Sequence, residues 1–194
     1  MAIKYSLKER LDFLAEEKFE KSTTVKVKEK NESGRACIVF SSQQQLLSIS
    51  LSEQNRLHYI NYSQVADGTV LEFLEDDTVN LHIVEIKRTI NSDRWIKVKN
   101  QFEGGLINSF GLCGVLNQKV KNIILYTAYV YDRFKWTDSA DPVDFKNSLG
   151  SKEKISVLDW NNSQVGLLHR KFTHVKIKLN ANGNANYTLR ISAP

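Results

Sequence analysis

The chain has 194 residues, of which 41% are hydrophobic, and its net charge is +5. These values predict a single domain, residues 1–194, with a core of its own, and the basic excess favours a polyanionic partner such as nucleic acid. Cys37 and Cys113 lack metal-ligand spacing and exclude a disulfide framework, and no apolar run is long enough to span a bilayer, so we expect a cytoplasmic protein without a membrane partner.

The chain is predicted to begin with a helix at residues 6–20. Ser6 and Glu9 have the spacing of a capping box, and leucine and phenylalanine recur after them at helical spacing. Alternating or short continuous apolar segments, separated by polar turns, then predict strands at residues 23–30, 36–40, 46–51 and 58–62.

A β-hairpin is the clearest prediction for the middle of the chain. Its arms are residues 69–74 and 79–88, and the polar turn 75–78 joins them. A helix is predicted at residues 95–118, where several glycines would allow close packing on a sheet and the apolar stripe consists of Val98, Phe102, Leu106, Phe110 and Cys113. A central strand rich in β-branched and aromatic residues follows at 120–131.

The last part of the chain is predicted to contain more strands. A loop or short helix at residues 137–151 precedes a short strand at 155–160. Asn182-Gly183 predicts a hairpin turn between strands at 171–179 and 185–191. The whole pattern predicts an α+β fold with a mixed β-sheet flanked by helices, with a core at about 6–135 and a C-terminal β-rich extension at about 136–194.

Counting outward from the hairpin turn places two carboxylates opposite each other. Equal steps from Asp76 pair Asp67 with Glu85, and Lys87 shares their face because side chains alternate along a strand. Opposed side chains have Cβ atoms ~5 Å apart, which suits shared binding of Mg²⁺ by oxygen ligands. Asp76 and Asp77 are excluded as ligands, because the extended strand between the turn and Glu85 spans about 26 Å.

Asp67 before one strand and Glu85-Ile86-Lys87 at the end of the next resemble the PD-(D/E)xK nuclease superfamily. The core of that family, which is helix, hairpin, helix and strand, has the order predicted for roughly the first two-thirds of this chain. Ala66 stands where the motif name has proline. Many members carry a glutamine in the following helix, and Gln101 matches that position.

The resemblance implies a restriction-endonuclease-like fold and a metal-dependent nuclease that hydrolyses phosphodiester bonds of DNA or RNA. It implies that Asp67, Glu85 and the Ile86 carbonyl hold one or two Mg²⁺ (or Mn²⁺) ions, which activate a water. Lys87 would neutralise developing charge and Gln101 would position the water. The family often adds an acid from the first helix, and it suggests a role in defence or mobile-element conflict; the candidate helix acids are Glu9 and Glu16.

Basic and aromatic residues near the predicted site are candidate nucleic-acid contacts. The basic residues are Lys97, Lys99, Arg133, Lys135, Arg170 and Lys171, and the aromatic residues that could stack bases are Trp95, Tyr131 and Trp136. Three alternatives stay open. First, Asp67, Glu85 and Lys87 could form only a surface ion-pair cluster. Second, the chain could be an inactive nuclease-fold module that binds nucleic acid, a protein partner or its own copy. Third, its C-terminal hairpin could join a larger assembly.

Overall fold

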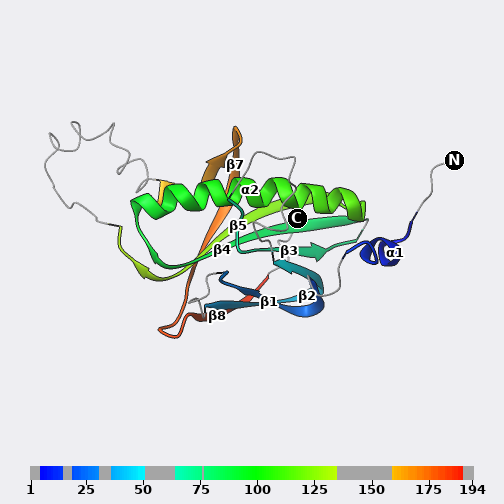
Figure 1. Ribbon diagram of the computed structural model, residues 1–194, viewed down its shortest axis with the longest axis horizontal. Coiled ribbons are helices and arrows are strands. Elements are labelled where there is room, and N and C mark those ends of the chain that lie inside the picture. Colours follow the sequence, from blue (N-terminus) through cyan, green and yellow to red (C-terminus); the bar gives the residue numbers. More distant parts are fainter. Residues whose placement is uncertain are drawn as a thin grey trace, which may run out of the picture.

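The computed structural model describes residues 5–14, 19–30, 36–50, 64–75, 77–134 and 159–189. Within these ranges two helices and eight strands follow each other along the chain (Figure 1). Their bounds are α1 Leu7–Leu11, β1 Phe19–Lys28, β2 Cys37–Ser50, β3 Gly68–Phe73, β4 Thr78–Ile90, α2 Ser92–Leu116, β5 Lys119–Asp132, β6 Gln164–Leu167, β7 Arg170–Lys178 and β8 Asn184–Thr188.

The strands form one mixed sheet in the order β1-β2-β3-β4-β5-β7-β6, and β8 pairs with β2 outside this path. Strands β1 to β4 are antiparallel neighbours, whereas β4, β5 and β7 run parallel. Helix α2 makes the crossover from β4 to β5, as parallel neighbours require. The predicted α+β fold with a mixed sheet is therefore confirmed.

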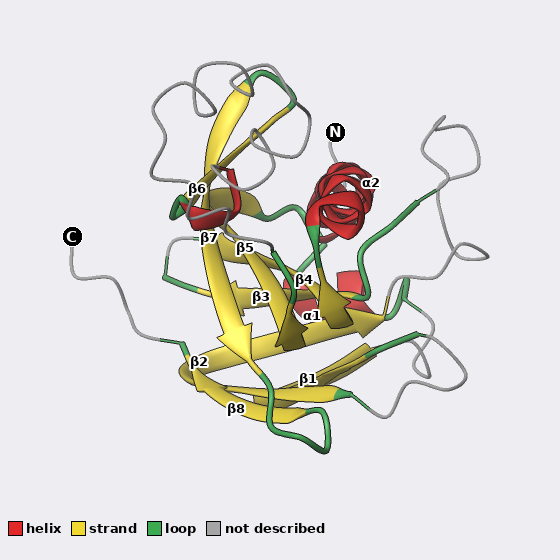
Figure 2. Ribbon diagram, turned by 90° about the vertical axis from the view of Figure 1, so that its left-hand side faces the viewer, coloured by secondary structure: helices red, strands yellow, loops and turns green. Residues whose placement is uncertain are grey.

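The sheet has two buried faces. Helix α2 covers one face above β3, β4 and β5, while β1, β2 and β8 curl beneath the other (Figure 2). Trp95, Phe102 and Leu106 of α2 pack in the first core with odd-numbered residues of β4, and even-numbered residues of β4 pack in the second core with Val25 and Ile38. Because both faces are covered, β4 is continuously buried from Leu81 to Ile86, including the polar His82 and Glu85.

The predicted hairpin is present as β3 and β4. Phe73 pairs with Val79, Leu71 with Leu81 and Thr69 with Ile83, which is the register predicted from the sequence. The polar turn and the apolar arms agree on this register, because a slip by one residue would move buried side chains to the other face.

Helix α2 confirms the predicted second helix, with an earlier start. Asn91 caps it by accepting a hydrogen bond from the Arg94 amide at 3.0 Å, and Asn117 ends it in the left-handed conformation. Four of the five residues of the predicted stripe are buried, but Phe110 is 43% exposed. The prediction for Phe110 is wrong because the buried face passes through Ser109, whose hydroxyl lies 2.7 Å from that of Thr69 on β3.

Two predictions for the N-terminal part are corrected. Among the described residues of the predicted first helix only α1 is helical, and Phe19 with Glu20 belongs to β1, because these residues pair with Ile49 and Ser48 of β2. The strands predicted at 36–40 and 46–51 are one strand, β2. Its polar middle passes through a register shift instead of a turn.

The predicted C-terminal hairpin is wrong in its pairing. Gly183 forms the expected turn with a φ of 82°, but β8 pairs in parallel with β2 and not with β7. Strand β7 pairs with β5 through Thr173–Lys178 and with β6 through Arg170–Thr173, whereas the Asn184–Thr188 segment pairs with Cys37–Ser41 of β2. Trp160, predicted at the end of a strand, lies in a helical turn at residues 159–161.

Several predicted segments lie outside the described residues: the turn at 31–34, the strand at 58–62, the loop at 137–151 and most of the strand at 155–160. The central strand β5 is confirmed, since it is paired on both sides. Cys113 is buried in the first core as predicted. Neither of the two described helices is both long and apolar enough to cross a membrane.

Candidate metal and phosphodiester site

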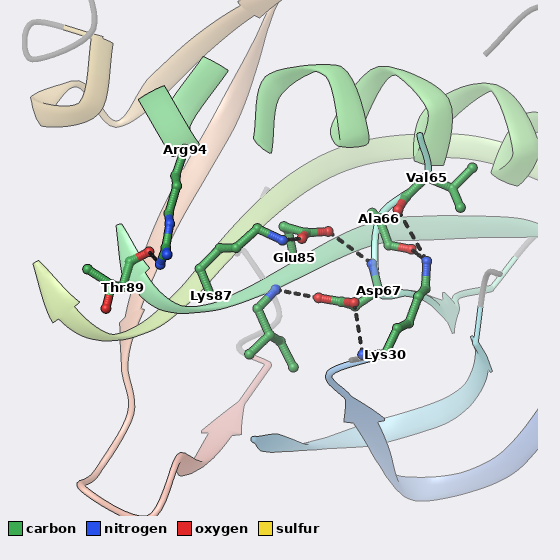
Figure 3. A network of polar contacts seen from close by, with 9 residues as sticks. Lys30, Val65, Ala66, Asp67, Glu85, Lys87, Thr89 and Arg94 are labelled. Atoms are coloured by element: carbon green, nitrogen blue, oxygen red, sulfur yellow. Dashed lines mark hydrogen bonds and ion pairs between the residues drawn. The ribbon is translucent and has the colours of Figure 1, made fainter. Parts of the chain in front are cut away.

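Asp67 and Glu85 meet where β3 and β4 separate (Figure 3). Gly68 and Val84 form the last pair of the β3–β4 ladder. Beyond it the Asp67 side chain takes the place of a backbone acceptor, because its Oδ2 accepts the Ile86 amide at 2.7 Å. The Asp67 amide in turn donates to Glu85 Oε2 at 3.1 Å. The sequence prediction that Asp67 lies opposite Glu85 thus corresponds to two direct contacts across the hairpin.

Both carboxylates are removed from solvent. Asp67 is 5% exposed and Glu85 is fully buried. Burial raises the pKa of both groups, and for Glu85 burial together with the neighbouring Asp67 charge raises the pKa to about 8. The Lys87 ammonium contacts Glu85 Oε1 and opposes this shift, but it does not cancel it. At neutral pH the pair therefore carries less than its full negative charge.

Lys30 is a member of the site that the sequence prediction missed. Its amide donates to Asp67 Oδ1 at 3.2 Å, and its ammonium group donates to the carbonyls of Val65 and Ala66. It follows β1 directly and lies near Asp67 only because β1 and β2 curl beneath the sheet (Figure 3). Lysines recur at every second position from Lys26 to Lys30, and nothing in the sequence distinguishes Lys30 from Lys26 and Lys28.

The donor set of this site fits a hard divalent cation. Two carboxylates lie side by side in a buried setting that disfavours the ionisation of both. The positive charge of a bound cation would stabilise their ionised forms. No third histidine, cysteine or carboxylate joins the pair within the described ranges. Mg²⁺ commonly takes one or two carboxylates and completes its shell with water and phosphate oxygens, so two carboxylates suffice.

A cavity of about 210 Å³ reaches Asp67 from the surface. It lies between the end of β1 and the start of β3, and its lining includes Lys26, Lys28, Ser48 and Gly68. The cavity gives Asp67 access to solvent, whereas Glu85 does not line it.

Gln101 lies on the site side of α2. The helix passes close to the segment before Asp67, since a Cβ at Gly105 would lie 3.0 Å from the Cβ of Ala66. Gln101 is one helical turn before Gly105, in the N-terminal half of α2. It is partly exposed. Its amide has no hydrogen bond to Asp67, Glu85 or Lys87 among the described residues.

The candidate helix acids are not part of this arrangement. Glu9 accepts hydrogen bonds from the Ser6 amide and hydroxyl, which lowers its pKa and completes the predicted capping box. Helix α1 is joined to the far end of α2 by a 2.9 Å bond from Arg10 to the Val115 carbonyl, about 21 Å along the helix from Gln101. Glu16 lies outside the described residues.

The predicted nucleic-acid contacts divide into several groups. Lys97 and Arg133 are exposed, as are Arg170 and Lys171 at the start of β7. Lys99 is held by Asp159 at 2.7 Å. Tyr131 is 45% exposed, but Trp95 of α2 is fully buried, so the predicted role of Trp95 in base stacking is wrong. Lys135 and Trp136 lie outside the described residues.

A second polar cluster lies on the opposite face of the hairpin. Glu72 accepts bonds from Ser42 and Asn80, and His82 lies 3.5 Å from it. These partners outweigh its burial and lower the pKa of Glu72 to about 2. His82 also contacts the Tyr126 hydroxyl through Nδ1 at 3.0 Å, and its buried Nε2 faces Glu72. This cluster and the Asp67–Glu85 pair thus place carboxylates in contrasting settings within one hairpin.

Comparison of the chain with protein-family models, with curated proteins and with solved structures gives no match. The interpretation of the site therefore depends on the geometry of Asp67, Glu85 and Lys87 and on the chemistry that these groups permit.

Proposed function

We propose that this protein is a metal-dependent nuclease of the PD-(D/E)xK type, with its site at Asp67, Glu85 and Lys87. The observation that carries the proposal is the pair of buried carboxylates joined across the end of the β3–β4 hairpin, with Lys87 in contact with Glu85. The order of hairpin, α2 and parallel β5 also agrees with the core that the resemblance implies. A structural ion pair has no need of two buried acids in one site.

Each residue then has a distinct task. Asp67 and Glu85 would hold Mg²⁺ or Mn²⁺, with the Ile86 carbonyl as the further ligand that the resemblance implies, and the bound cation would supply an activated water and charge stabilisation. Lys87 contacts Glu85, and its ammonium group would donate to a phosphate oxygen or to the attacking water. The water oxygen bonds to phosphorus, the phosphorus–oxygen bond to the leaving group breaks, and that oxygen leaves as a hydroxyl.

The test is cleavage of labelled single- and double-stranded DNA and RNA with Mg²⁺ or Mn²⁺. Asp67→Asn and Glu85→Gln should each lower the cleavage rate by at least about 10²-fold, since each removes a charged ligand. Glu75→Gln is the matched control, because Glu75 is exposed at the other end of the same hairpin. Full activity in either site variant would refute the assigned site.

A second candidate is a nuclease-fold module that binds nucleic acid or a protein without cleaving it. One observation favours it: each of the four carboxylate oxygens already accepts a hydrogen bond from a protein donor. A cation would have to use the remaining lone pairs of these oxygens or displace a donor. Calorimetric titration with Mn²⁺ separates the candidates. The nuclease should show a heat of binding that Glu85→Gln abolishes, whereas the module should show none.

A further inference from the structure

A row of side chains leads sideways from the site across three parallel strands. Glu85 on β4 is in register with Thr127 on β5, and Thr127 with Lys176 on β7. One step further along the strands, Lys87 is in register with Tyr129 and Tyr129 with Lys178. Residues in register across neighbouring strands point to the same face, and this is the face that α2 covers at Trp95 and Phe102. The row therefore begins at the proposed site.

The lysines at the outer end of this row are exposed and held over aromatic rings. The Lys178 ammonium lies 5.1 Å from the centre of the Tyr129 ring, and the Lys176 ammonium lies 5.0 Å from that of Trp160. Neither lysine has a carboxylate partner in the part of the chain that the structure describes. These aromatic contacts, with a 2.5 Å hydrogen bond from the Lys178 ammonium to the Val130 carbonyl, hold both ammonium groups in place without neutralising their charge.

Tyr131 continues the same face of β5 beyond Tyr129. Its ring is 45% exposed, and Thr89 is its neighbour on β4. Arg94 reaches the Thr89 carbonyl from the start of α2 at 2.8 Å, so a further cation lies beside this end of the row. Figure 3 shows Lys87 between Glu85 and the Arg94–Thr89 contact. An exposed aromatic ring thus has lysines on one side and an arginine on the other.

The carboxylates near the row are engaged elsewhere. Asp132 accepts bonds from the Phe134 amide and from the Trp160 indole, both at 3.0 Å. Asp159 is paired with Lys99. These acids reduce the positive field, but none of them contacts the row lysines among the described residues.

We propose that Lys176 and Lys178 of this row, together with Tyr131, bind a single strand of nucleic acid beside the site. The lysines bind successive phosphates, and the Tyr131 ring stacks with an unpaired base. Stacking needs a base whose face is open, which a single strand offers and a duplex does not. Cleavage of that strand depends on the proposed nuclease function, but its binding does not.

The experiment measures fluorescence anisotropy of a labelled oligothymidylate of 20 nucleotides, in EDTA and at several salt concentrations. Lys176→Gln/Lys178→Gln should weaken binding and reduce the slope of log affinity against log salt by about 1.4, because two phosphate contacts are lost. Tyr131→Ala should weaken binding about tenfold, and Tyr131→Phe should restore it. The control Lys119→Gln/Lys121→Gln removes the same charge from the exposed start of β5.

The outcomes separate this proposal from the nuclease proposal. Loss of affinity in the row variants but not in the control supports the row, whether or not the wild-type protein cleaves the strand. An unchanged slope in Lys176→Gln/Lys178→Gln, or an equal loss in the control, would overturn it, as would undetectable binding by the wild-type protein. Equal or tighter binding of a duplex of the same length would overturn the role of Tyr131.

Discussion

Glu85→Gln should stabilise the metal-free protein at neutral pH although it removes the proposed function. Glu85 is fully buried beside Asp67, and its pKa in the folded protein is about 8 against an ordinary value of 4.5. Folding at pH 7 therefore requires uptake of a proton that the unfolded chain does not hold. Glutamine has the shape of the protonated acid and needs no proton.

The size of the effect follows from the two pKa values. A carboxyl group with a raised pKa contributes its full stability below the unfolded value of 4.5 and loses it as pH rises toward 8. Each pH unit between these limits is worth about 1.4 kcal/mol. The advantage of Glu85→Gln over the wild type should thus be below about 1 kcal/mol at pH 5 and about 3 kcal/mol at pH 7.

The assay is urea unfolding in EDTA at pH values from 5 to 8, followed by the fluorescence of the buried Trp95 and Trp160. Glu72→Gln is the matched control in the same hairpin. The pKa of Glu72 is lowered to about 2, so its ionised form stabilises the fold and its replacement should destabilise the protein at pH 7. The two substitutions should have opposite signs.

A difference between wild type and Glu85→Gln that stays constant from pH 5 to 8 would refute this reasoning. It would mean that Glu85 ionises normally in the folded protein. A cation gives a second check, because Mg²⁺ or Mn²⁺ that binds the ionised pair should raise wild-type stability most at high pH and leave Glu85→Gln unchanged.

Three other predictions concern the surroundings of the site. Lys30→Met should destabilise the protein by about 1–3 kcal/mol in urea unfolding, because the carbonyls of Val65 and Ala66 lose their ammonium donor; a neutral result would contradict this role. Burial lowers the pKa of His174 to about 4, so in the Glu85→Gln background stability should fall by about 3 kcal/mol as pH decreases from 6.5 to 4, and His174→Asn should remove this dependence. Gly104→Ala should lower the free energy of unfolding by about 3 kcal/mol, since the added Cβ would lie 1.9 Å from the Gln64 carbonyl oxygen. Gly114→Ala, where the added Cβ meets open space, should raise the free energy of unfolding by up to about 1 kcal/mol. Equal effects of the two substitutions would contradict the close packing at Gly104.

Some of the fold could be read from local patterns. The β3–β4 register was predictable because the polar turn and the apolar arms specify the same alignment. The α2 helix was predictable from its periodicity over seven turns of chain. The same local patterns failed for Phe19 and Glu20 and for the pairing of the strand after the Asn182-Gly183 turn, where the partner strand and not the segment itself decides the structure.

The site shows the same division. Asp67, Glu85 and Lys87 were found because they belong to one hairpin, in which counting along the chain places them together. Lys30 was missed because it reaches Asp67 through the curl of β1 and β2, which joins residues 37 positions apart. Lys176 and Lys178 were missed because their place beside the site depends on the parallel register of β5 with β7.

The sequence by itself determined the hairpin, the helix after it and the opposition of Asp67 and Glu85, because each depends on contacts within one supersecondary unit. Only the tertiary structure decided what surrounds that pair. Burial under α2 and over the curled strands raises the pKa of both acids, and strand order places Lys176 and Lys178 in the row that starts at Glu85. The spacing of side chains along a strand follows from the sequence, whereas the dielectric environment and the strand order arise only when distant segments pack together.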